Sequence, residues 1–144
     1  MKKLVFLAIV SVTLFGCKKP ATYKNEIKED VAYLANDKLE GRQTGTEGEK
    51  IAADYLVNRF QNIGLEPKGS DGYIQSYSFK PKTDPHKEVE FTTNADSTIT
   101  GRNVIGYINN NAKTTIVIGA HYDHLGWGAE GSLYRGEPAI HNGA

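Results

Sequence analysis

Cysteine is nearly absent from this sequence, since Cys17 is the only one among 144 residues. A chain with a single cysteine can form no internal disulfide, so a hydrophobic core must hold its fold. An excess of basic charge is absent too, because 17 lysines and arginines balance 17 aspartates and glutamates. Proteins that bind nucleic acids rely on such an excess to attract phosphates. We therefore expect no nucleic-acid partner.

A long apolar run is also missing. The most apolar stretch, Leu4 to Phe15, is shorter than the roughly 20 residues that a membrane-spanning helix needs. It follows two lysines and ends shortly before Cys17, which is the arrangement of a signal peptide. An uncleaved apolar anchor is the alternative interpretation.

The residues around Cys17 resemble the lipobox of bacterial lipoproteins, in which this cysteine is acylated and becomes the new N-terminus; the bulky Phe15 departs from its commonest form. The resemblance implies a lipoprotein signal peptide at 1–16 and a lipidated tether at 17–22. We expect the chain to be exported and anchored by its lipid to a membrane of the bacterial cell envelope.

Two helices are predicted in the first part of the remaining sequence. Apolar residues recur at helical spacing from Tyr23 to about Lys38. After turn residues at 41–45, Thr46 and Glu49 form the pattern of a capping box, in which each side chain accepts the other's backbone N–H. Gly64 provides the left-handed residue that ends the second helix. The predicted apolar face of that helix consists of Ile51, Tyr55, Leu56, Phe60 and Ile63.

The pattern changes from helix to strand after residue 72. The predicted order is a strand at 73–79, a loop at 80–86, a strand at 88–93, a turn at 94–98 and a strand at 103–108. Thr114–Ala120 differs because three apolar β-branched residues are consecutive at 116–118, as in a strand that is covered on both faces. We expect this segment to be the central strand of a sheet, and a glycine-rich loop from Gly126 onward.

Two histidines and an aspartate follow this predicted strand directly, at His121, Asp123 and His124. Ligands of open α/β sheets bind at the carboxyl ends of the strands, where a histidine can present a ring nitrogen to a metal. A carboxylate two positions further on can orient that ring through a hydrogen bond. The pattern indicates a metal site, and a polar strand end that faces water is the alternative.

Seven short motifs appear in a fixed order along the chain. They are 34–42 (LANDKLEGR), 44–48 (TGTEG), 52–56 (AADYL), 63–65 (IGL), 103–106 (NVIG), 121–126 (HYDHLG) and 142–144 (NGA). In order and spacing they resemble the N-terminal region of the co-catalytic zinc aminopeptidases related to aminopeptidase Y and the bacterial leucyl aminopeptidases. The resemblance covers nearly all of the sequence after the signal peptide.

The resemblance implies an α/β fold, namely an incomplete three-layer α/β/α sandwich with a mixed sheet. Residues 23–144 would form its N-terminal part, and the C-terminal half, with the remaining metal ligands, would follow Ala144. The implied activity is hydrolysis of N-terminal residues from peptides that have a free amino terminus, with two Zn²⁺ ions in the complete active site. We expect the 144 residues alone to be inactive.

The resemblance also implies roles for single residues. His121 would be a terminal ligand of one zinc, and Asp123 would act in catalysis by holding His121 in its metal-binding tautomer. His124 has no definite role but could lie behind the ligands. The loop 41–45 would lie near the rim of the active site. Trp127 and Tyr134 could line a side-chain pocket, whereas His86 and His141 are expected to be surface histidines.

Three alternatives remain open. The stretch 119–126 is one residue short of the His-x-His-x-Asp-His motif of metallo-β-lactamase-type hydrolases, because Gly119 stands where the first histidine should be. Non-catalytic ectodomains with an aminopeptidase-like fold that act as binding surfaces are the second alternative, although His121 and Asp123 are retained here. A single-zinc enzyme similar to glutaminyl cyclase is the third.

Overall fold

The computed structural model describes residues 23–92, 98–128 and 131–143. Its helices are α1 (Tyr23–Leu34), the 3₁₀ helix η1 (Asp37–Arg42) and α2 (Glu47–Asn62), and its strands are β1 (Glu66–Pro67), β2 (Ile74–Phe79), β3 (Ile99–Val104) and β4 (Gly106–Tyr107). The predicted signal peptide, Cys17 and the tether lie outside the described residues, as does most of the predicted turn at 94–98.

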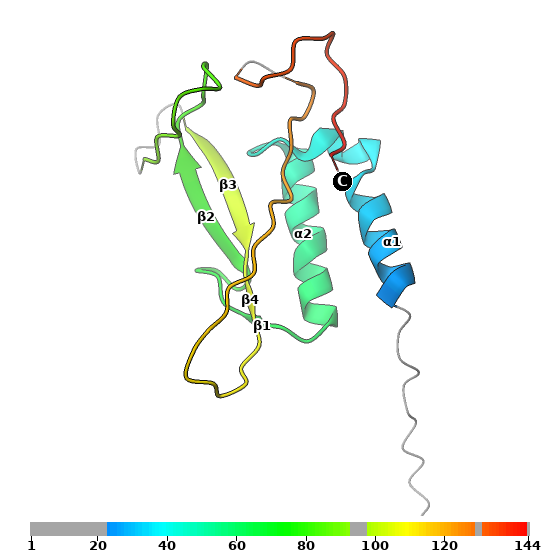
Figure 1. The fold of residues 1–144 in the computed structure, drawn as a ribbon, viewed down its shortest axis with the longest axis vertical. Coiled ribbons are helices and arrows are strands. Elements are labelled where there is room, and N and C mark those ends of the chain that lie inside the picture. The colour runs from blue at the N-terminus through cyan, green and yellow to red at the C-terminus, as the bar shows by residue number, and fades with distance from the viewer. Residues whose placement is uncertain (1–22, 93–97, 129–130, 144) are drawn as a thin grey trace, which may run out of the picture.

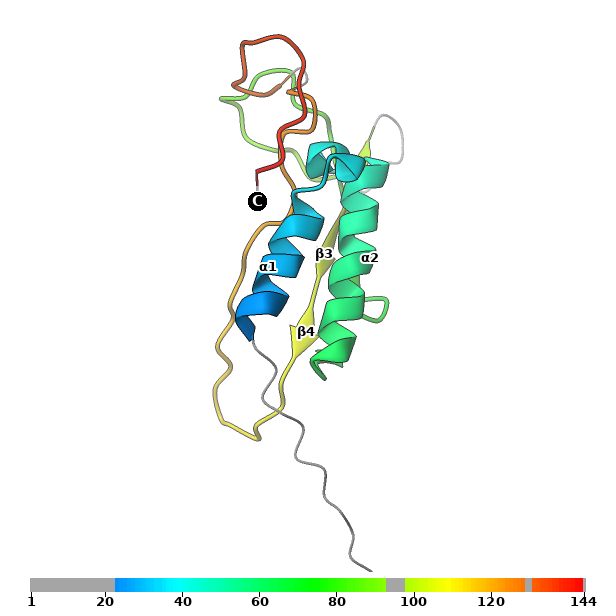
Figure 2. The same cartoon turned by 90° about the vertical axis from the view of Figure 1, so that its right-hand side faces the viewer.

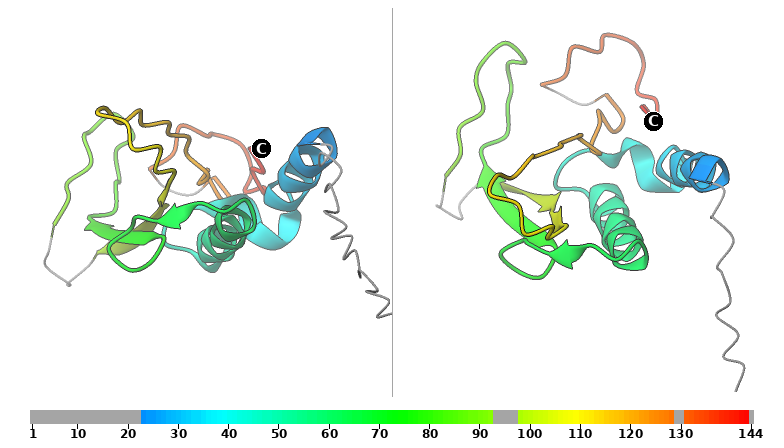
Figure 3. Two further views of the ribbon diagram at one scale, coloured as in Figure 1. Left: turned by 90° about the horizontal axis from the view of Figure 1, so that it is seen from below. Right: turned by 60° about the horizontal axis from the view of Figure 1, so that its bottom comes forward.

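Helices and short antiparallel sheets together give a mixed α/β architecture. In Figures 1 and 3, α2 lies between the strands on one side and α1 on the other. Strand β2 pairs with β3 from Ile74↔Val104 to Phe79↔Ile99, and β1 pairs with β4. None of the helices in the described ranges has the length and apolarity that a membrane crossing requires.

The beginning of α2 confirms half of the predicted capping box. The Thr46 side chain accepts a hydrogen bond from the Glu49 N–H at 3.4 Å. The predicted second bond, from the Thr46 N–H to the Glu49 side chain, does not form. The Thr46 N–H donates to the Gln43 carbonyl instead, and the Glu49 carboxylate turns inward to Arg102 and Tyr122. At the other end of the helix, Gly64 has φ +83°, as predicted.

Polar and aromatic contacts join α1 to α2, which lie side by side in Figure 2. The rings of Tyr33 and Tyr55 stack with their centroids 3.9 Å apart, and the Tyr55 hydroxyl donates to Asp30. Arg59 forms ion pairs with Glu26 and Asp30, at 3.1 Å and 2.7 Å. Helix α1 ends at Leu34, earlier than predicted, because the chain turns there into η1.

The most deeply buried apolar contact lies between η1 and α2. Leu39, Ala52 and Ala53 are buried there, and a Cβ on Gly48 would lie only 1.9 Å from the Leu39 carbonyl oxygen. Small side chains therefore allow the two backbones to approach closely. The predicted apolar face of α2 is only partly right, because Ile63 at its end is exposed.

Two predicted strands require correction. At 88–93 the described residues form only an isolated bridge, Phe79↔Phe91, and Phe91 is exposed. The prediction at 103–108 is met in part, since β3 already begins at Ile99 and a break at Ile105 separates it from β4.

The predicted central strand at Thr114–Ala120 is wrong in this structure. The segment has no strand assignment, and Ile116, Val117 and Ile118 are 86%, 88% and 92% exposed. Figures 1 and 2 show it running from β4 toward the C-terminal loop without joining the sheet. A strand of consecutive apolar residues forms only where neighbouring strands pair with it and other layers cover it, and the described residues provide neither.

The close contact at Gly48 leads to a prediction about stability. We expect Gly48→Ala to lower the free energy of unfolding by about 1–3 kcal/mol, because the new methyl group overlaps the Leu39 backbone. This loss should exceed the gain of about 1 kcal/mol in helix propensity. Asp54→Ala, at an exposed position of the same helix, is the control and should not destabilise the protein. Denaturant unfolding measures both, and equal stability of Gly48→Ala and the parent would contradict the packing argument.

The contact between Tyr55 and Asp30 leads to a prediction about alkaline pH. Burial, together with the hydrogen bond to Asp30 and its negative charge, raises the pKa of Tyr55 to about 12. The folded state therefore keeps this proton while the unfolded chain releases it near the ordinary value of about 10. Stability should fall as the pH rises from about 10 to about 12. Tyr55→Phe should lose less stability over this interval in urea titrations, and identical losses in both proteins would disprove the assignment.

Candidate functional site

Arg42 forms hydrogen bonds to three separate segments of the chain, one of which contains the predicted metal ligand His121. Its side chain is buried, and its Nε donates to the Tyr122 carbonyl at 2.6 Å and its Nη2 to the Asn142 carbonyl at 2.5 Å. Nη1 donates to the Leu34 carbonyl at the end of α1. Burial lowers the pKa of the Arg42 guanidinium, and the charge of Asp123 opposes this shift. Arginine stays protonated in proteins nonetheless, so a fixed positive charge lies beneath the site.

The loop around Arg42 has an unusual backbone that brings it against residues 122–126. Glu40, Gly41 and Arg42 all have positive φ angles, of 47°, 67° and 50°. A Cβ on Gly41 would lie 2.6 Å from the carbonyl oxygens of Gly126 and His141, so only glycine fits there. The Arg42 carbonyl accepts the His124 N–H at 3.1 Å, and the Gly41 carbonyl accepts that of Gly126, also at 3.1 Å. The loop 41–45 therefore lies against the histidine motif, and its place at the rim of an active site stays a prediction.

His121 and Asp123 form the contact that the sequence predicted. His121 Nδ1 lies 2.9 Å from the Asp123 carbonyl oxygen and 3.2 Å from Asp123 Oδ1. Both partners can only accept hydrogen bonds, so Nδ1 carries a proton, and in the neutral ring Nε2 then keeps its lone pair. The His121 side chain is 78% exposed.

The second carboxylate oxygen of Asp123 is also engaged. The Thr44 hydroxyl donates to Asp123 Oδ2 at 2.6 Å. Thr44 lies in the connection between η1 and α2, 79 residues away in the sequence. The contact thus ties the histidine motif to the loop before α2.

The sequence did not predict a buried hydrogen-bond network around Glu49 that lies beneath the histidine motif. The Glu49 side chain is 1% exposed and pairs with Arg102 Nη1 at 2.7 Å, while the Tyr122 hydroxyl donates to Glu49 Oε1 at 2.5 Å. Burial and this hydrogen bond raise the pKa of Tyr122, so its hydroxyl stays protonated. Because Tyr122 stands between His121 and Asp123, the network fixes the backbone that bears both. The capping box had predicted a bond from the Glu49 side chain to the Thr46 N–H instead.

The other histidines occupy different surroundings. His86 is exposed, as predicted, but His141 is not a simple surface residue, because its Nε2 is buried and has no hydrogen-bond partner. The Tyr134 ring lies edge-on to His141, 4.3 Å between centroids. His124 packs against Gly143, with its ring centroid 6.4 Å from that of His141. This arrangement assigns no chemical role to His124.

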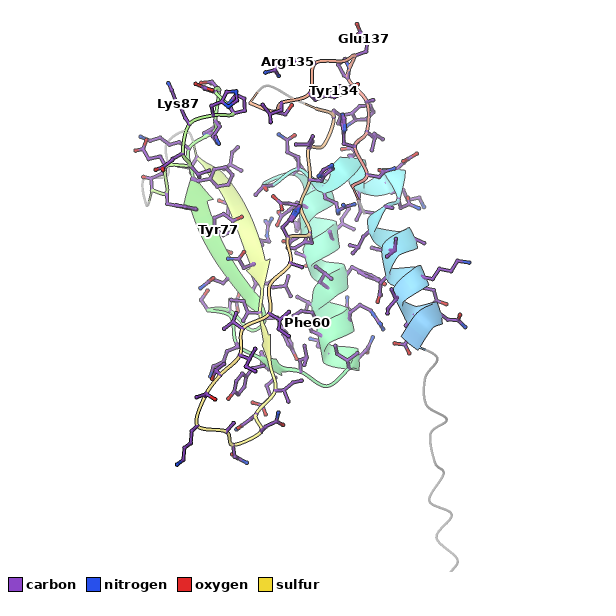
Figure 4. All side chains as sticks on the ribbon, viewed as in Figure 1. Phe60, Tyr77, Lys87, Tyr134, Arg135 and Glu137 are labelled. Carbon is purple, nitrogen blue, oxygen red and sulfur yellow. The ribbon has the colours of Figure 1, made fainter. Side chains whose placement is uncertain are left out.

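The two aromatic residues predicted for a side-chain pocket lie in the C-terminal loop. Trp127 is exposed, and the Tyr134 hydroxyl donates to the Glu137 carbonyl at 2.9 Å, so Tyr134 stabilises its own loop. Figure 4 shows Tyr134 and Glu137 on this C-terminal loop. An open hollow of about 750 Å³ lies instead along β2 and is lined by Ser76, Tyr77, Ser78, Phe91 and Thr92. The pocket role of Trp127 and Tyr134 stays a prediction.

A complete metal site is not formed by the described part of the chain, in which no three histidine, cysteine, aspartate or glutamate side chains converge. A catalytic zinc takes three protein ligands and a water. The free Nε2 of His121, backed by a carboxylate on Nδ1, has the donor chemistry of one such ligand. His121 therefore fits a zinc ion as one ligand among several.

Comparison with known proteins identified no relative of this chain. The chain matches no protein-family model, no curated protein and no solved structure.

The hydrogen bonds of Arg42 predict a large loss of stability on substitution. Arg42→Met removes the donors to three carbonyls at once, and bonds to charged groups contribute about 1.5–3 kcal/mol each. We expect the free energy of unfolding in urea to fall by about 3 kcal/mol or more. Arg135→Met is the control, because within the described residues this exposed arginine bonds only to carbonyls of its own loop, and the substitution should change stability by less than about 0.5 kcal/mol. Similar effects of the two substitutions would refute the role of Arg42.

Proposed function

We propose that this chain is the N-terminal part of a zinc-dependent aminopeptidase. The enzyme would be exported and held at the bacterial cell envelope by a lipid on Cys17. Its substrates would be peptides with a free amino terminus, and its complete active site would hold two Zn²⁺ ions. The described helices and antiparallel strands would belong to a three-layer α/β/α sandwich in the whole protein.

The observation that carries this proposal is the contact between His121 and Asp123. Metal-binding histidines commonly donate their second ring N–H to a carboxylate or a carbonyl, which fixes the tautomer and the orientation of the ring. His121 Nδ1 faces both kinds of acceptor on Asp123. Nε2 is therefore held as the atom available to a metal, and the high exposure of the side chain leaves it accessible.

The convergence of the motifs supports the same proposal. The motifs at 34–42, 44–48, 121–126 and 142–144 are up to about a hundred residues apart in the sequence, yet Arg42 and Thr44 bond directly to Tyr122, Asp123 and Asn142. Segments that a family shares for a common site are expected to meet in space. A common metal site would require such contacts between these motifs.

Within this proposal each residue has a defined part. Bound zinc ions would supply a water of lowered pKa and would polarise the scissile carbonyl. His121 would hold one of these ions through Nε2, and Asp123 would keep the proton on Nδ1. The remaining ligands and the general base would come from the chain after Ala144, so residues 1–144 would be inactive by themselves.

Substitution of His121 tests the proposal in the full-length gene product. We expect His121→Ala to weaken Zn²⁺ binding at least about 100-fold and to abolish release of N-terminal residues from peptides, because a direct ligand is lost. Metal analysis after dialysis and a peptidase assay measure the two effects. His86→Ala, an exposed histidine outside the site, should change neither.

Two results would reject the proposal. One is full zinc content and full activity in His121→Ala. The other is a full-length parent protein that binds no zinc and releases no residues from peptides.

A further inference from the structure

We infer that Thr44 is a positioning residue for His121 and acts through the carboxylate of Asp123. The inference builds on the proposed function, because the value of a fixed His121 ring lies in metal binding. The contact that carries it is the hydrogen bond from the Thr44 hydroxyl to Asp123 Oδ2, at 2.6 Å.

The two oxygens of Asp123 are divided between two partners. Oδ2 accepts from Thr44, and Oδ1 faces His121 Nδ1 at 3.2 Å. Rotation of a carboxylate about its last torsion meets only a broad, shallow energy profile, so one bond at 3.2 Å holds it weakly. The side chain of Asp123 is also 39% exposed, which lets water compete for both oxygens. A second, short hydrogen bond therefore decides which way the carboxylate plane points.

Thr44 is itself held in place. A Cβ on Gly101 would lie 2.7 Å from the Thr44 Cγ2 methyl, so this methyl group packs directly against the β3 backbone. Two heavy atoms on Cβ restrict the side chain to few rotamers, and a fixed methyl fixes the hydroxyl as well. The adjacent residue Gln43 forms a parallel bridge with His124. The donor thus comes from a rigid position, joined to the backbone of the histidine motif.

Thr44 affects the His121 ring through one intermediate residue, Asp123. With Oδ2 bound to Thr44, Oδ1 stays opposite Nδ1 and favours the tautomer that has its proton on Nδ1. Without the hydroxyl, the carboxylate can turn toward water, and the Asp123 carbonyl at 2.9 Å is then the remaining acceptor that favours a proton on Nδ1, so the tautomer is held less strongly. Thr44 touches neither the proposed metal nor a substrate, so its effect appears in the state of the His121 ring.

Two variants of the full-length protein separate the hydroxyl from the methyl group. Thr44→Val removes the donor and keeps the shape, while Thr44→Ser keeps the donor and removes the methyl. Nitrogen-15 NMR of the histidine rings reports the tautomer of His121 in metal-free protein at alkaline pH, where imidazoles are neutral. Competition with a chromophoric chelator reports Zn²⁺ affinity.

We expect the parent and Thr44→Ser to hold His121 with its proton on Nδ1. Thr44→Val should shift the ring part of the way toward the mixed tautomers of a free imidazole, because the Asp123 carbonyl still accepts from Nδ1, and should weaken Zn²⁺ binding by up to about tenfold, the lower end of the effect of removing a direct partner of a ligand. Circular dichroism should show the same fold in all three proteins.

An unchanged His121 tautomer in Thr44→Val overturns the inference, whatever the zinc affinity. A Thr44→Ser spectrum that lies no closer to that of the parent than the Thr44→Val spectrum does overturns it as well, because the hydroxyl would then not be the active group. A shifted tautomer in Thr44→Val, in a parent protein that binds no zinc, upholds the positioning role and rejects the peptidase proposal. The NMR and metal readouts thus test the two proposals separately.

Discussion

The buried guanidinium of Arg42 is the contact on which the arrangement of this site depends. A charge taken out of water requires compensation, and here three backbone carbonyls provide it through hydrogen bonds, while the charge of Asp123 adds to it from a distance. Carbonyls are fixed to the main chain, so each bond fixes a backbone position and not only a side chain. The end of α1, the histidine motif and the C-terminal loop are thereby placed relative to η1. Only a residue with several donors in a planar fork can serve all three, which lysine cannot do.

Close backbone contacts surround this centre. Gly41 lets η1 touch the loop at Gly126, and Gly48 lets α2 touch η1 at Leu39. In both places a methyl group would overlap a carbonyl oxygen, so the fold uses the absence of side chains to bring rigid segments together. Beneath them, Glu49 links α2 to β3 through Arg102 and to the histidine motif through Tyr122. The histidine motif is therefore held by contacts that involve α2, β3 and the η1 loop.

The exposed surface of the site follows from this rigid base. His121 projects into solvent, yet its Nδ1 is engaged by Asp123, and Asp123 is engaged by Thr44. A histidine at the end of such a series combines accessibility with a defined ring orientation, which a freely rotating surface histidine lacks. This combination suits a metal ligand and explains why an exposed residue needs so much buried support.

The sequence by itself determined the local features. Helical spacing, the Thr46 cap and Gly64 located α2, and the spacing of His121 and Asp123 predicted the contact between them, because these features depend on neighbours along the chain. Tertiary structure decided the rest. Glu49 pairs with Arg102 instead of forming the expected bond at the helix end. Residues 114–120 form no strand, because no described strand pairs with them. Arg42 and Thr44 bond to residues about 80 to 100 positions away. These contacts depend on which distant groups the fold brings together, and the spacing of residues over a short stretch of sequence carries no information about that.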